Sequence, residues 1–397
     1  MSHLASPTLF ATGVASRLLD RNRICETFFS AQARRLAELS CATAERFQAG
    51  GRLLAFGRGP YSTDAQHVSV EFVHPVIVGK RALPALDISA LFGPWLKAIL
   101  HPQDIVMGFG PPTGDPEIWE SLHNARAAGA LAVTLPGAEG DYHFEAATSD
   151  PFIHQEVIEI LYHTLWETVH VFLERREAGL DSGEAGFLYP FLGRQKQETS
   201  DLIAEVAGSI LMKSADDARL RARMAAESSE EIWDTSVAIA GRVARGGKLI
   251  LFGNGGSATD ANDWAFDCVL PPDGFHPVPA VSLSMEPANI TAVANDVGTE
   301  LIFLRQIIAQ ARPEDVAIGI STSGGSRNIV MALEEARKRN LLTVALLGYD
   351  GGEIRRRGLA DFALVVPSDY IPRIQEVQAS VYHVIRENLE WMEHAPA

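Results

Sequence analysis

The sequence predicts an α/β protein made of two tandem domains, each a doubly wound, five-stranded parallel sheet flanked by helices. The chain has 397 residues, enough to bury two hydrophobic cores. It repeats itself at a spacing of about half its length, and each copy alternates short apolar segments with helical stretches. Because such alternation produces parallel strands with helices on both faces, we expect the same sheet twice.

The repeat is clearest around a glycine-containing turn in each half. AGGRLLAFGRGPYSTDA (49–65) aligns without a gap with RGGKLILFGNGGSATDA (245–261). The closing helices contain HQEV (154–157) and IQEV (374–377), each followed by a histidine eight positions after the glutamine. We therefore predict domains at 1–180 and 198–397. A linker at 181–197 is expected between them, since glycine and small polar residues interrupt the apolar pattern there.

Each copy is expected to begin with a long helix and to end with a closing helix. Between these, short apolar runs bounded by turn residues are typical of buried strands. In the second copy these strands are expected at 248–252, 278–283, 316–320, 343–347 and 362–366.

The composition indicates a globular protein of the cytoplasm. Hydrophobic residues make up 47% and charged residues 21%, and no apolar run approaches the roughly 20 residues of a membrane span. We expect no membrane partner and no secretory signal. A net charge of −16 disfavours direct nucleic-acid binding. It does not exclude an anionic small molecule as a ligand, because amides at a helix N-terminus can hold a phosphate.

Two hydroxyl-rich turns in the second copy predict a phosphate site. GNGGSA (253–258) and ISTSGGS (320–326) each follow a strand and lead into a helix. Since neighbouring parallel strands end at one edge of a sheet, both turns can hold the same anion. Either turn alone is equally typical of an ordinary strand-to-helix connection. The occurrence of two such turns at one edge of the sheet favours a phosphate site.

The first copy lacks these hydroxyl groups. The positions of Ser257, Ser321, Thr322, Ser323 and Ser326 are taken there by Tyr61, Gly110, Pro111, Pro112 and Asp115. The prolines have no amide to donate, and Asp115 places a carboxylate where a phosphate would lie. We expect no phosphate in the first copy.

These two turns, with AND (294–296), RIQEV (373–377) and the histidine that follows it, resemble the phosphoheptose isomerase branch of sugar isomerase (SIS) domains over nearly all of 198–397. The chain thus resembles a tandem of two SIS domains. The resemblance implies that the phosphate is contacted by Ser257, Ser321, Thr322, Ser323 and Ser326. It also implies that Asn254 and Asp296 lie near the sugar.

The resemblance also implies a divalent metal, with zinc the expected ion. Its ligands in the family are a histidine and a glutamate one helical turn apart, plus the glutamine and histidine of the closing helix. In the first copy these positions are His67, Glu71, Gln155 and His163. Imidazole, carboxylate and amide groups suit such an ion. A helix-surface pair and a core histidine are the alternative.

In the second copy the metal positions are Asp263, Asp267, Gln375 and His383. The glutamine and histidine are retained, whereas two aspartates replace the histidine and the glutamate. Because aspartate is shorter than either, the sequence leaves open whether the second copy holds a metal.

The activity that the resemblance implies is an aldose–ketose isomerase, an intramolecular oxidoreductase acting on a phosphorylated sugar. The reaction would convert sedoheptulose 7-phosphate to D-glycero-D-manno-heptose 7-phosphate through an enediolate. The base and acid roles would belong to Glu71 and His163 in one copy and to Asp267 and His383 in the other. A site shared between copies is also possible. A homodimer would supply the four SIS units of the family's tetramers.

A non-catalytic alternative has its own support in the sequence. Asp263 and Asp267 replace the expected histidine and glutamate, which favours a phosphosugar sensor or an assembly factor. One SIS relative of that kind binds a replication initiator protein. Fold resemblance alone does not decide between the two.

Overall fold

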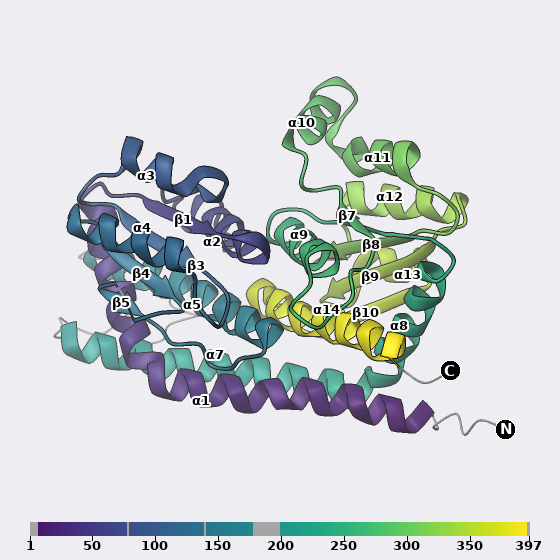
Figure 1. Ribbon diagram of the computed structural model, residues 1–397, viewed down its shortest axis with the longest axis horizontal. Coiled ribbons are helices and arrows are strands. Elements are labelled where there is room, and N and C mark those ends of the chain that lie inside the picture. Colours follow the sequence, from purple (N-terminus) through teal and green to yellow (C-terminus); the bar gives the residue numbers. More distant parts are fainter. Residues whose placement is uncertain (1–6, 78, 139, 178–198, 395–397) are drawn as a thin grey trace. The chain divides into compact units, whose positions relative to one another are not determined.

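Two five-stranded parallel sheets organise the chain (Figure 1). The computed structural model describes residues 7–77, 79–138, 140–177 and 199–394. One compact unit comprises residues 24–215, and the other comprises residues 1–23 with 216–397. Two long helices, α1 (Pro7–Gln48) and α7 (Thr199–Glu227), each contribute to both units.

The predicted domain boundaries at 180 and 198 follow the sequence repeat rather than these compact units, and they stay a prediction. The predicted linker at 181–197 lies outside the described residues.

The unit of residues 24–215 has the strand order β2-β1-β3-β4-β5, with every neighbouring pair parallel. Its strands are β1 (Leu53–Gly57), β2 (Ala85–Asp87), β3 (Ile105–Phe109), β4 (Leu131–Leu135) and β5 (Tyr142–His143). Its further helices are α2 (Ser62–Val73), α3 (Phe92–Ile99), α4 (Pro116–Ala127) and α5 (Pro151–Glu177). Leu53 and Ala55 pack into a core with α1, α2 and α5, whereas Leu54 and Phe56 pack with α3 and α4. Helices therefore cover both faces of the sheet.

The second unit repeats this arrangement in the order β10-β9-β8-β6-β7. Its strands are β6 (Leu249–Phe252), β7 (Ala280–Ser282), β8 (Val316–Ser321), β9 (Leu342–Gly348) and β10 (Phe362–Val366). Its helices are α8 (Ser229–Val243), α9 (Gly256–Val269), α10 (Pro287–Asp296), α11 (Ile302–Gln310), α12 (Arg327–Lys338), α13 (Gly352–Arg356) and α14 (Ile371–His394). The five predicted strands are confirmed to within two residues at each end.

The two units also match in the contacts that fix each sheet. The amide of Arg52 donates to the Asp104 carboxylate at 2.9 Å, and the amide of Lys248 donates to the Asp315 carboxylate at 2.9 Å. In both units this bond joins the start of the first strand to the turn before the third. The fold prediction, a tandem of doubly wound parallel sheets, is confirmed. Among the described residues, no helix combines the length and the apolar character needed to cross a bilayer.

The order of the strands reverses beside the two predicted phosphate turns. From β6 the chain moves to one side to form β7 and then returns to the other side to form β8. The helices that follow β6 and β8 therefore leave from opposite sides of this point, and ligands of doubly wound sheets bind at such a reversal. Both hydroxyl-rich turns start there, directly after β6 and β8.

Gly253 is required by the close approach of the chain at the first of these turns. A Cβ atom at Gly253 would lie 2.1 Å from the carbonyl oxygen of Ser257. We expect Gly253→Ala to lower the free energy of unfolding by about 3 kcal/mol, because backbone has to move to accommodate it. Urea unfolding measures this. Gly241→Ala, in helix α8 and 3.8 Å from only a flexible arginine tip, should instead leave stability equal or slightly higher. Equal stability of both variants would contradict the conclusion that the backbone leaves no room for a Cβ atom at Gly253.

Candidate functional site

The first hydroxyl-rich turn leads directly into helix α9. Gly255 precedes the helix with a φ of 56°, in the left-handed region that favours glycine. Ser257 lies in the first turn of the helix and is buried. The backbone amides at the start of α9 therefore lie at the carboxyl edge of the sheet, where the helix dipole favours an anion.

The second turn gathers its hydroxyl groups around one point. The Ser321 and Ser326 hydroxyl oxygens lie 3.2 Å apart. The amide of Gly324 donates to the Ser321 hydroxyl, and that of Gly325 donates to the Ser323 hydroxyl, each at 3.2 Å. Ser326 precedes helix α12 as its N-cap. This turn can therefore offer hydroxyl groups and a helix N-terminus to the same ligand.

A reciprocal amide pair joins the first turn to the start of α12. Asn254 donates through Nδ2 to Asn328 Oδ1 at 2.9 Å, and Asn328 returns the bond at 2.8 Å. A depression of about 490 Å³ lies beside this pair, lined by Thr299, Glu300, Ser326, Arg327, Asn328 and Met331. Sequence reasoning missed Asn328, although its place two residues after the last serine of the turn was a usable signal.

Two other predicted contacts, Thr322 and Asp296, form different interactions from those of the serine hydroxyl groups. Thr322 is half-buried, and its carbonyl accepts the amide of Gly348 at 2.9 Å, which fixes the turn to the end of β9. Asp296 is exposed at the end of α10, where it accepts a bond from Asn295 at 2.8 Å. Its predicted position near the sugar stays a prediction.

A buried acid–histidine cluster lies further along α9. Asp263 and Asp267 are one helical turn apart, and His383 faces them from α14. His383 Nε2 is 3.2 Å from Asp267 Oδ2 and 3.6 Å from Asp263 Oδ2. The Tyr382 hydroxyl donates to Asp263 Oδ2 at 2.7 Å. The shorter acids therefore still reach the histidine. Gln375, the other predicted ligand, is buried on the same helix.

The environment of Asp267 suits proton transfer near neutral pH. Burial and the charge of Asp263 raise the pKa of Asp267 to about 7, while His383 acts in the opposite direction. A carboxyl group that titrates near the working pH can both take up and release a proton during a reaction. Along the axis of α9, the backbone of Asp267 lies about 15 Å from that of Ser257, counting 1.5 Å per residue.

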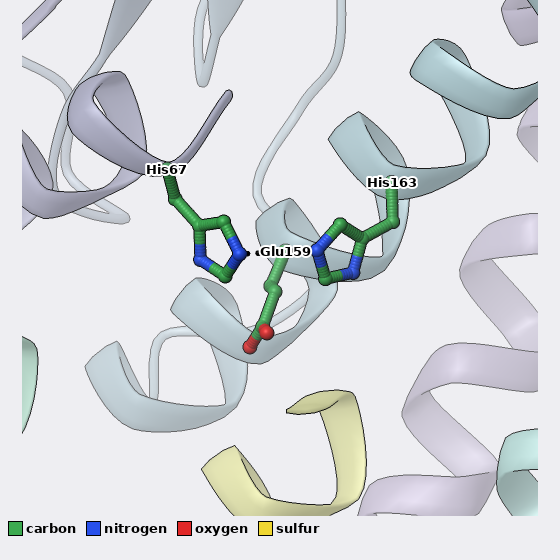
Figure 2. Close-up of side chains that lie close together, drawn as sticks. All are labelled: His67, Glu159 and His163. Atoms are coloured by element: carbon green, nitrogen blue, oxygen red, sulfur yellow. Dashed lines mark hydrogen bonds between the residues drawn. The ribbon is translucent and has the colours of Figure 1, made fainter. Parts of the chain in front are cut away.

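The other unit contains a second buried cluster, formed by His67 of α2 and Glu159 and His163 of α5 (Figure 2). The Nε2 atoms of the two histidines lie 3.2 Å apart, and one ligand atom from each of the three residues lies within 4.8 Å of the others. Figure 2 shows the rings directed toward each other, with the carboxylate beside them. Sequence reasoning missed Glu159, although it precedes His163 by one helical turn.

Glu71 and Gln155 lie at the edge of this cluster. Glu71 Oε1 is 3.8 Å from His67 Nε2, and Glu71 Oε2 has no hydrogen-bond partner among the described residues. Burial and the charge of Glu167 raise the pKa of Glu71 to about 8. Gln155 donates through Nε2 to Thr63 Oγ1 and to Asp64 Oδ2, each at 3.3 Å.

The donor set of this cluster fits a zinc-class ion. Burial, with the neighbouring imidazole of His163, lowers the pKa of His67 well below its ordinary range, so its ring is in the neutral form that ligates metals. Two nitrogen donors on tetrahedral zinc are about 3.3 Å apart, close to the 3.2 Å between these rings.

The first copy fills its own phosphate turn with a carboxylate. Asp115 caps helix α4, where its Oδ1 accepts the amides of Glu117 at 2.8 Å and Ile118 at 3.3 Å. Arg58 lies 3.4 Å from Asp115 Oδ2. The helix N-terminus that would face a phosphate is therefore already occupied by a negative side chain.

Comparisons with known proteins identify a family for part of the chain. The family model described as "SIS domain" matches residues 215–348. A phosphoheptose isomerase of a Nitratiruptor species is 46% identical over 142 residues, which cover 35% of this chain and 73% of the relative. That of Chlorobaculum tepidum is 42% identical over 187 residues, covering 46% of this chain and 88% of the relative.

A solved structure resembles the chain over almost its whole length. The C-terminal domain of glucosamine-fructose-6-phosphate aminotransferase from Francisella tularensis has a TM-score of 0.62 at 9% identity, covering 95% of this chain and 94% of that one. At such an identity the likeness shows the fold alone. The two phosphoheptose isomerases are 46% and 42% identical and are covered over 73% and 88% of their own length, so the chain belongs to the SIS-domain family, and its fold contains the same kind of parallel sheet twice.

Proposed function

We propose that this protein is a phosphosugar aldose–ketose isomerase that converts sedoheptulose 7-phosphate to D-glycero-D-manno-heptose 7-phosphate. The observation that carries the proposal is the pair of hydroxyl-rich turns after β6 and β8, joined by Asn254 and Asn328. The relatives named phosphoheptose isomerase, which are 46% and 42% identical to parts of this chain, support the choice of substrate.

In the proposed complex, the two turns bind the phosphate. Ser257 and the amides at the start of α9 contribute from one side, and the hydroxyl groups of Ser321, Ser323 and Ser326, with Thr322, contribute from the other. Asn254 and Asp296 bind sugar hydroxyl groups. This anchoring places the carbon atoms that react at the far end of an extended sugar, away from the phosphate.

The buried cluster of the same unit supplies the acid and the base. Isomerisation requires a base that removes the proton from carbon 1 of the ketose and returns a proton to carbon 2 of the enediolate. We assign this role to Asp267, whose pKa is about 7, and assign to His383 the proton that moves between the two sugar oxygens. Glu71 and His163 of the first copy are the alternative pair.

We further propose a divalent metal, with zinc the expected ion. The first copy would hold it with His67, Glu159 and His163, with Glu71 beside them and Gln155 as a further candidate. In the second copy Asp263, Asp267, Gln375 and His383 are the candidate ligands, as an alternative to the base and acid roles assigned to Asp267 and His383. When bound near the substrate, such an ion supplies a positive charge that polarises a carbonyl oxygen. A homodimer, with four SIS units, is the expected assembly.

The proposal is tested by following the conversion of sedoheptulose 7-phosphate to the aldose by NMR with the metal-supplemented full chain. We expect turnover by the wild type. His383→Ala should lower kcat by at least about 100-fold, the contribution typical of a general acid or base. His163→Ala should have the smaller effect. A larger loss with His163→Ala would move the chemistry to the first copy.

The rate should also depend on the ionisation of Asp267. Because only the ionised carboxylate can accept a proton, we expect kcat/KM to rise with pH through about 7, where Asp267 loses its proton. A pH–rate profile of the wild type measures this limb, and a buffer-matched profile of His163→Ala should retain it. A rate that does not change through neutral pH would contradict the role of Asp267.

A non-catalytic phosphosugar-binding protein is the second candidate function. The replacement of the family's histidine and glutamate by Asp263 and Asp267 favours it. Such a protein would bind sedoheptulose 7-phosphate in a calorimetric titration and leave it unchanged after prolonged incubation with metal.

A further inference from the structure

We infer that the second unit binds a zinc-class divalent ion at a surface site formed by His276, Glu390 and His394. His276 belongs to the loop between α9 and β7, and the other two residues lie at the end of α14. This group is separate from the buried cluster of Asp263, Asp267 and His383.

The three side chains already converge on one point. His276 Nδ1 lies 2.8 Å and His394 Nε2 lies 2.9 Å from the same oxygen, Glu390 Oε1. Donor atoms around tetrahedral zinc are about 3.3 Å apart. The distances from the two ring nitrogens to the Glu390 oxygen differ from this spacing by only a few tenths of an ångström, and all three donor atoms lie within 4.8 Å of one another. Two imidazoles and one carboxylate leave the fourth position of such an ion open to water.

Solvent reaches the group from one side, while the carboxylate is held from the other. The side chains of His276 and His394 are 55% and 61% exposed, whereas that of Glu390 is only 10% exposed. Glu390 Oε2 accepts the backbone amide of His276 at 2.7 Å and lies 3.4 Å from Nη1 of Arg386. These bonds orient the carboxylate and direct Oε1 toward the two rings, as outer contacts do in metal sites.

The loop that carries His276 is stiffened by its own sequence. Pro277 follows the histidine, and the amide of Phe275 donates to the carbonyl of Pro272 at 3.0 Å in a turn. Arg386 donates to the carbonyl of His276 and, through Nε, to the carbonyl of Asp267 at 3.1 Å. Because the loop is already ordered by these contacts, little entropy is lost when an ion binds.

The repeat provides an internal comparison. In the first copy, the residue four positions before β2 is Arg81, and the residues seven and eleven positions after His163 are His170 and Glu174. There an ion pair between Lys80 and Glu174 joins the loop before β2 to the end of α5. His170 Nε2 lies 3.1 Å from the carbonyl oxygen of Arg81 in the same loop. The second copy has two histidines and a carboxylate at the matching positions, where a bound metal would join the loop before β7 to the end of α14.

The test is a zinc titration of the tag-free full chain by calorimetry, together with metal analysis after dialysis. We compare the wild type with the double variant His276→Ala/His394→Ala, whose exposed side chains can be removed without opening the core. The double variant should bind one zinc equivalent fewer. It should also lose a zinc-induced rise in Tm of roughly 5 °C, the shift expected at about 100-fold excess over Kd.

His101→Ala, which removes an exposed histidine of the other unit, should retain the full stoichiometry and the full rise in Tm. His394→Gln should weaken the same equivalent, and the metal-free Tm of every variant should equal that of the wild type. The inference is overturned if the double variant binds as many equivalents as the wild type. It is also overturned if His101→Ala loses the same equivalent, because binding would then depend on scattered surface histidines.

Discussion

Ser326→Asp is expected to abolish phosphosugar binding while leaving the fold intact. The substitution copies Asp115, which takes the corresponding position in the first copy and caps α4. Aspartate is a good N-cap, so helix α12 should remain stable. Its charge would lie about 4 Å from the phosphate, where repulsion of roughly 4 kcal/mol per pair of charges corresponds to about a 1000-fold loss of affinity.

Isothermal titration with sedoheptulose 7-phosphate measures this loss. Ser326→Asn is the matched control, because asparagine also caps a helix but carries no charge, and it should retain most of the affinity. If the aspartate and asparagine variants bind equally well, the phosphate is not held at this turn.

Asp267→Asn is expected to remove activity and, at high pH, to make the protein more stable. The pKa of this buried carboxyl is raised from 3.8 to about 7 in the folded protein. A raised folded pKa means that its stabilising contribution is present below about pH 4 and is lost as the pH rises through 7. The cost of the buried charge above pH 7 is about 4 kcal/mol at most, since each pKa unit is worth about 1.4 kcal/mol.

The comparison is made by urea unfolding at pH 8 and at pH 4, alongside the isomerase assay. The variant should be more stable than the wild type at pH 8 and equal to it at pH 4, and its kcat should fall at least about 100-fold. Asp273→Asn, an exposed substitution in the same unit, should change neither quantity. Full activity in Asp267→Asn would remove this residue from the mechanism.

The sequence was sufficient for the sheets and for the two turns because both depend on local patterns. Short apolar runs identified each strand of the second copy, and the spacing shared by the two copies transferred the same topology to the first. For the same reason the sequence placed Ser321 correctly at the end of a strand and Ser257 at the start of the helix that follows a strand.

The contacts between distant elements could not be predicted from local sequence patterns. The approach of Glu159 to His67 depends on how α2 packs against α5, and the pairing of Asn254 with Asn328 depends on β6 and β8 being neighbours. The group around Glu390 depends on where the loop after α9 returns to the sheet. Each joins residues that are distant in sequence. Local spacing could mark Asn328 and Glu159 as candidates, but it could not show which residues they contact.

The most direct test of the account is to incubate the full chain with sedoheptulose 7-phosphate in deuterium oxide and to follow both sugar carbons by NMR. An enediolate formed by a side-chain base exchanges its proton with solvent, so we expect deuterium at carbon 2 of the aldose and at carbon 1 of the recovered ketose. Binding of the phosphosugar with neither aldose nor deuterium would contradict the isomerase and establish a binding protein instead.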